Sequence, residues 1–150
     1  MTLFISVFQI LVLCFGFLAA KHDLRTFLIP NRLNLNIFLL SLSTLVIRFD
    51  SKVFLVCLTI FLLHLLPALL IPNSIGMGDV KFIGALSLMF NSVEQVVIWI
   101  GLSYGFGLIH GFWLKISKNS SRIPFGVSIY GAFTLVSVGE YLCVAMDYCR

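Results

Sequence analysis

Two aspartates lie beside long apolar segments, where a carboxylate is more often functional than incidental. Asp23 belongs to the stretch "KHDLRTFLIPNR" after the first apolar segment, and Asp79 belongs to "SIGMGDVKFIGAL" at the start of a later one. A carboxylate at the level of the bilayer is costly unless it faces protein or a water-filled cavity. A single aspartate is also a common helix cap, but two at one level of the membrane are harder to explain as caps.

If Asp23 and Asp79 meet, they can act together as acid and base. Repulsion and poor solvation would raise the pKa of one member, so that the pair shares one proton and titrates as a unit. The ionised carboxylate then takes a proton from a water molecule while the protonated one polarises a peptide carbonyl. This is aspartic peptidase chemistry, and because it needs only carboxylates and water, we expect no metal and no cofactor.

Two glycines precede the second aspartate. Gly76 and Gly78 have no Cβ atoms, so they permit unusual backbone angles and let a substrate backbone approach closely. A flexible turn after Pro72 explains the same residues, since glycine is common at the ends of membrane helices.

The composition indicates a membrane protein. The chain has 150 residues, of which 60% are hydrophobic and 11% charged, and its mean hydropathy is +1.09. That leaves too little polar surface for a soluble globule. The first apolar run has no Lys or Arg before it, so we expect a retained first helix rather than a secretory signal. The net charge of +4 comes without a stripe of basic and aromatic residues, which favours loops at an anionic membrane face over nucleic-acid binding.

The apolar blocks predict an all-α, polytopic membrane protein with about six transmembrane helices in a single domain, residues 1–150. The blocks run over residues 2–20, 33–47, 53–72, 78–90, 94–114 and 125–146. Helix 78–91 would rise about 20 Å and helix 33–47 about 21 Å, both less than the roughly 30 Å hydrocarbon core. We therefore expect the ends that carry the aspartates to be sunk below the membrane surface.

The basic residues predict the orientation. Seven of the ten lie on the side of Asp23 and Asp79, namely Lys21, Arg25, Arg32, Lys81, Lys115, Lys118 and Arg122. The other side carries Arg48, Lys52 and Arg150. Positively charged loops stay in the cytoplasm, so both aspartates are expected at the cytoplasmic face and both termini outside.

Several other ionisable residues have more than one possible role. Lys81 either biases the charge of Asp79, or holds a substrate carboxylate, or extends to the interface as a surface lysine. Arg25 is expected mainly to fix the orientation of the chain in the membrane, and only secondarily to attract the substrate. Glu140 is the rival carboxylate, but its distance of roughly 22 Å along the last helix places it near the outer interface. His64 and His110 are expected to be partnered core histidines rather than metal ligands.

The two aspartate stretches resemble the motifs of type IV prepilin peptidases. "GMGDVKFIGAL" resembles the G-x-G-D signature, and "DLRTFLIPNRLN" resembles the other motif, in which Arg25, Pro30 and Asn31 follow Asp23 at the family's spacing. A third stretch, "IPFGVSIYGAF", resembles the start of the family's last helix, except that Val127 stands where proline or another small residue is frequent.

The resemblance implies a membrane aspartic endopeptidase with Asp23 and Asp79 as its catalytic pair. Its partners would be prepilin or pseudopilin substrates, cleaved at the cytoplasmic side of a bacterial inner membrane. Larger members add a cytoplasmic domain with paired C-x-x-C motifs for N-methylation, whereas this chain is similar to the short members of tight-adherence (Flp) pilus systems. Two alternatives stay open: a non-enzymatic subunit of pilus assembly or transport that binds a proton or cation, and a peptidase for archaeal preflagellin-like substrates. The oligomeric state does not follow from the sequence.

Overall fold

The computed structural model describes residues 2–72, 74–118 and 123–148, with side chains over 5–72, 74–117 and 123–140. These residues form six helices, which confirms the all-α prediction: α1 (Thr2–Thr26), α2 (Asn31–Ile47), α3 (Ser51–Leu70), α4 (Met77–Ser87), α5 (Val93–Lys118) and α6 (Phe125–Tyr148). Helices suit a bilayer because they satisfy their own backbone hydrogen bonds.

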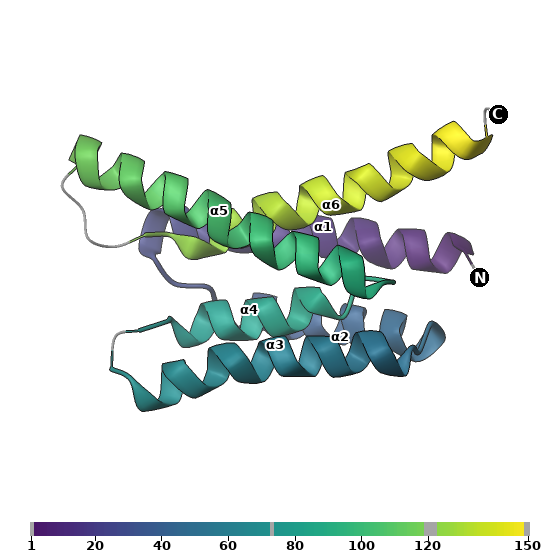
Figure 1. Cartoon of the computed structure of the whole chain (residues 1–150), viewed down its shortest axis with the longest axis horizontal. Helices are drawn as coiled ribbons and strands as arrows, with labels where there is room; N and C mark the ends of the chain where they lie inside the picture. The colour runs from purple at the N-terminus through teal and green to yellow at the C-terminus, as the bar shows by residue number, and fades with distance from the viewer. Residues whose placement is uncertain (1, 73, 119–122, 149–150) are drawn as a thin grey trace.

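The helices form two layers. α2, α3 and α4 lie together in one layer, and α1, α5 and α6 lie in the other (Figure 1). Large apolar side chains fill the interior; Phe82, Trp99 and Phe133 are fully buried. Trp99 also donates its indole N–H to the carbonyl of Ile129 at 3.1 Å, which ties α5 to α6.

The outer surface is apolar, as expected for a protein that spans a membrane several times. Three helical segments are long and apolar enough to cross a bilayer, namely Ile5–Thr26, Ser51–Leu70 and Val93–Ser117. Asn31–Ile47 and Phe125–Glu140 are shorter apolar helices. Exposed leucines such as Leu70 and Leu108 point away from the bundle, where lipid tails would cover them.

α4 is shorter than the sequence predicted. It ends at Ser87 instead of continuing to residue 90, because Met89 and Phe90 bond back into a turn with Leu86 and Ser87. Its 11 residues rise about 16 Å, roughly half of the hydrocarbon core. α4 is therefore too short to cross a bilayer, and its first turn, with Asp79, lies outside the three long spans.

α1 is longer than predicted. The polar stretch after residue 20 was expected to be a connection, but the helix continues through Asp23 to Thr26. No proline occurs before Pro30, so nothing in this stretch breaks a helix. The helix ends at Phe27, which has a positive φ of 55°. Asp23 is thus held on a helix rather than in a loop.

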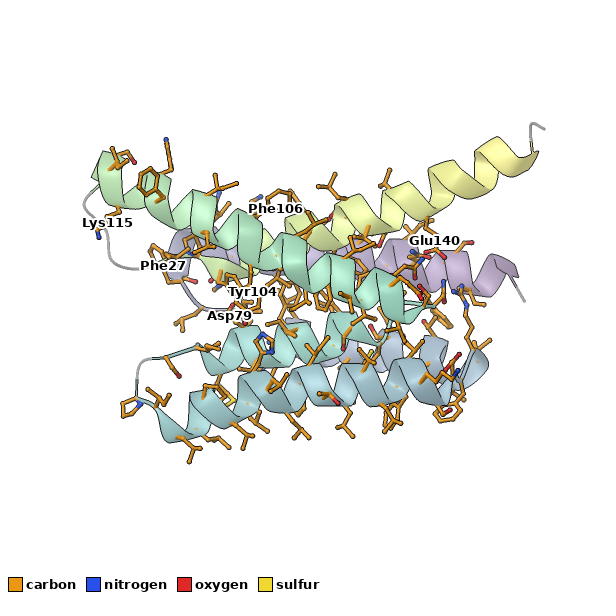
Figure 2. All side chains as sticks on the ribbon, viewed as in Figure 1. Phe27, Asp79, Tyr104, Phe106, Lys115 and Glu140 are labelled. Atoms are coloured by element: carbon orange, nitrogen blue, oxygen red, sulfur yellow. The ribbon has the colours of Figure 1, made fainter. Side chains whose placement is uncertain are left out.

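The two ends of the bundle carry different residues. The beginning of α1 and the end of α6 lie at one end (Figure 1). Asp79, Phe27 and Lys115 lie toward the opposite end, far from Glu140 (Figure 2). The Glu140 carboxylate accepts a hydrogen bond from the Asn91 side chain at 2.7 Å. Glu140 therefore belongs to a separate polar network, as its predicted depth suggested, and is no rival to the aspartate pair.

Candidate active site

Asp23 is a buried carboxylate held by the first turn of another helix. Its side chain is only 3% exposed, and its Oδ2 accepts the backbone N–H of Gly126 at 2.9 Å. Gly126 is the second residue of α6, and the first N–H groups of a helix have no partner within it. The positive end of the helix dipole adds to this contact. The start of α6 therefore offsets part of the cost of burying a charged Asp23.

Asp79 lies in the first turn of α4, where the chain leaves the glycine turn. Its backbone N–H donates to the carbonyl of Gly76 at 2.9 Å, and its carboxylate also lies next to Gly76. A Cβ atom on Gly76 would lie 3.1 Å from Asp79 Oδ2. Burial, and then the nearby charge of Asp23, raise the pKa of Asp79 to about 7. The two aspartates therefore interact electrostatically.

Ile29, in the α1–α2 connection, packs against the first turn of α4 and the first turn of α6. A Cβ atom on Gly78 would lie 3.5 Å from Ile29 Cβ, and one on Gly126 would lie 2.8 Å from Ile29 Cδ1. Asn34 of α2 also donates its amide N–H to the Gly78 carbonyl at 3.0 Å. These contacts gather the first turns of α4 and α6 around one short connection, which brings Asp23 and Asp79 into one region.

The other residues expected at the site divide into two groups. Lys81 donates to the Asn31 side chain at 3.0 Å, which joins the two aspartate motifs. Pro30 is the N-cap of α2, and its carbonyl accepts the backbone N–H groups of Leu33 and Asn34. Arg25, in contrast, is exposed on α1. The structure thus brings Asn31, Lys81 and Gly78 together and leaves Arg25 at the surface.

Three residues at the site were not singled out from the sequence: Ile29, Asn34 and Gly126. All three lie inside the stretches that resemble the family motifs. Membership of those stretches was the one feature of the sequence that could have pointed to them. Their roles depend on contacts between distant segments, such as the 103 positions that separate Asp23 from Gly126.

His64 is a partnered core histidine, as expected. It is 5% exposed; its Nδ1–H donates to the Ile60 carbonyl at 2.6 Å, and its Nε2 accepts from the Tyr104 hydroxyl at 2.6 Å. Over the part of the chain described, no group of three or more His, Cys, Asp or Glu side chains is placed to hold a metal ion.

Replacing Tyr104 by phenylalanine should destabilise the protein. The change leaves the buried Nε2 of His64 without a donor, which costs about 1–3 kcal/mol. Unfolding in mixed micelles at increasing denaturing detergent would measure the loss. A variant as stable as the wild type would show that this contact contributes nothing.

Comparison with known families identifies the chain. The model of the type IV leader peptidase family matches residues 10–112, more than half of the sequence. The matched range contains Asp23, both glycines, Asp79 and Lys81, whereas the stretch around Gly126 lies beyond it. Searches of curated proteins and of solved structures found no match. The chain therefore belongs to the type IV leader peptidase family, the aspartic peptidases that remove the leader peptides of prepilins.

Proposed function

We propose that Asp23 and Asp79 are the catalytic pair of this leader peptidase and that it cleaves prepilin or pseudopilin leaders at the cytoplasmic face of the membrane. The observation that carries this proposal is that the two carboxylates, Asp23 and Asp79, lie close together. A buried Asp23, bonded to the start of α6, lies close enough to Asp79 to help raise its pKa to about 7. Coupled carboxylates of this kind are the starting state of aspartic peptidases.

The surroundings assign different roles to the two carboxylates. The backbone N–H donor at the positive end of α6 favours the negative charge on Asp23 over Asp79, so we assign Asp23 the role of the base. Asp79 then carries the proton and polarises the scissile carbonyl. Asp23 takes a proton from water as the water oxygen attacks the carbonyl carbon, and Asp79 gives its proton to the carbonyl oxygen. When the C–N bond breaks, Asp23 returns its proton to the leaving nitrogen and Asp79 recovers its own from the hydroxyl group.

The geometry favours a substrate presented at the membrane surface. Asp79 is reached over Gly76, which is exposed and has no side chain to block an extended peptide. Lys21 and Arg25 at the end of α1, Lys81 near the start of α4 and Lys115 at the end of α5 lie at this end of the bundle, which supports a cytoplasmic active site, termini outside and a bacterial inner membrane. Cys14, Cys57, Cys143 and Cys149 form no C-x-x-C pair, so we propose cleavage without N-methylation.

A purified sample tests the enzymatic proposal against a non-enzymatic assembly role. The protein alone, in detergent micelles, should convert a purified prepilin to its shortened form, which mass spectrometry detects at the cleavage site. A sample that binds prepilin but never cleaves it, with or without other assembly proteins, would overturn the proposal.

The cleavage rate should fall when the pH rises above neutral. Asp79 has its pKa raised to about 7, so it is protonated below that pH and ionised above it. The mechanism needs Asp79 protonated, and the rate should therefore drop up to about tenfold per pH unit on the alkaline side. Initial rates across neutral pH would measure this, with Glu140→Gln as a variant expected to keep the profile. A rate that increases steadily into alkaline pH would contradict the proposed roles.

A further inference from the structure

A groove opens between α2, α3 and α4, on the far side of α4 from the aspartates. It encloses about 590 Å³ and is lined mostly by apolar side chains. On α4 it is lined by Lys81, Gly84, Ala85 and Leu88, which recur at helical spacing on one face. Asp79 points from the opposite face of the same helix, about 200° around it from Lys81. The groove is thus a separate surface from the catalytic pair.

One end of the groove is polar and lies at the level of Asp79. Lys81 and Asn31 bond to each other there, and Asn34 lies beside them on the wall. The Asn34 amide N–H is bonded to the Gly78 carbonyl, so this end is anchored to the glycine turn itself. From Lys81 to Leu88 the groove continues for about 10 Å along α4. Toward Leu88 it is lined by the aromatic side chains Phe38, Phe54 and Phe61.

A leader peptidase with its catalytic pair at the membrane surface must receive a substrate that is itself in the membrane. We propose that this groove binds the apolar helical segment of the prepilin that follows the scissile bond. The proposal rests on the proposed function and adds where the substrate lies. The chain would leave the groove at Lys81, cross the α4 start over Gly76 and reach Asp79.

The polar end distinguishes a peptide from a lipid tail. Asn34 is 4% exposed, and among the side chains and backbone that the structure describes its amide oxygen has no hydrogen-bond partner. A buried acceptor of this kind favours an occupant with a free N–H group. The first turn of a membrane helix has such N–H groups, and the extended residues before it have carbonyls for the Lys81 amine. An acyl chain provides neither of these groups.

Filling the groove tests the proposal kinetically. Leu58 lines the groove on α3 and is 40% exposed, whereas Leu62 on the same helix is 43% exposed and does not line it. Leu58→Trp should raise KM for a full-length prepilin about tenfold with kcat unchanged, because the segment that it displaces contributes to substrate and transition-state binding alike. Leu62→Trp should change neither constant. A short peptide with the leader and cleavage site but no apolar segment should be cleaved equally by both variants and the wild type.

Two kinetic results would overturn the inference. Unchanged kinetics in Leu58→Trp would show that the prepilin does not use the groove. Equal losses for the prepilin and the short peptide would show that the tryptophan acts on the catalytic pair instead.

Crosslinking separates the inference from the proposed function, since it reports binding without cleavage. A photoreactive benzoylphenylalanine in place of Leu58, in an Asp79→Asn background, should capture prepilin in membranes, and the same probe at Leu62 should not. Capture of phospholipid alone at Leu58 would overturn the inference even if the wild-type enzyme cleaves prepilin. Capture of prepilin at Leu58, combined with a wild-type protein that never cleaves prepilin, would support the groove and refute the peptidase roles.

Discussion

Asp23→Asn and Asp79→Asn should each abolish prepilin cleavage. Asparagine keeps the shape of the side chain but can neither take a proton from water, as Asp23 must, nor donate one to the carbonyl, as Asp79 must. Acid or base catalysis by one group contributes about 10²-fold to 10⁴-fold, so each variant should be slower by at least about a hundredfold. Initial rates with purified enzyme and prepilin in micelles would measure the loss.

The fold should survive both changes. Neither substitution changes side-chain volume appreciably, and above neutral pH, where Asp79 is ionised, neutralising it removes its repulsion with Asp23. Unfolding in mixed micelles should therefore show Asp79→Asn to be as stable as the wild type or more so. Glu140→Gln is the matched control because it neutralises a carboxylate at the other end of the bundle (Figure 2). Full cleavage by either asparagine variant would remove that aspartate from the catalytic pair.

The sequence predicted that the two aspartates lie at the same end of the bundle, but it predicted less well the elements that hold them. Six apolar blocks were enough to predict six helices, because a bilayer imposes long apolar segments. The end of α1 was missed because charged residues after residue 20 suggested a loop. A helix can continue past the hydrocarbon core while its side chains become polar, and here it carries Asp23 into the protein interior.

The contacts between distant segments were beyond the reach of local patterns. Lys81 lies two positions from Asp79, which suggested an effect on its charge, yet the helix turns the two side chains to opposite faces and Lys81 bonds Asn31. Likewise, nothing near Asp23 in the sequence indicates that a backbone N–H of α6 completes its surroundings. That contact exists only because the α1–α2 connection packs against α6 at Ile29 and Gly126.

Gly126→Ala should strongly reduce cleavage although it adds only one methyl group. The new Cβ atom would lie 2.9 Å from Asp23 Oδ2 and 2.8 Å from Ile29 Cδ1, closer than carbon can approach either atom. Asp23 is 3% exposed, so its carboxylate has little free space. Either Asp23 or the start of α6 must shift, and a displacement of about 1 Å at a catalytic group can cost about 10²-fold in rate.

Gly139→Ala provides the control on the same helix. Among the residues that the structure describes, a Cβ atom on Gly139 would meet nothing within 4 Å, so this variant should cleave prepilin at the wild-type rate. Both substitutions replace glycine by alanine within α6, which favours the helix by up to about 1 kcal/mol. A loss of activity confined to Gly126→Ala cannot then come from a weakened helix, and must come from the contacts of the α6 start with Asp23 and Ile29. Equal rates in the two variants would show that α6 does not position the catalytic base.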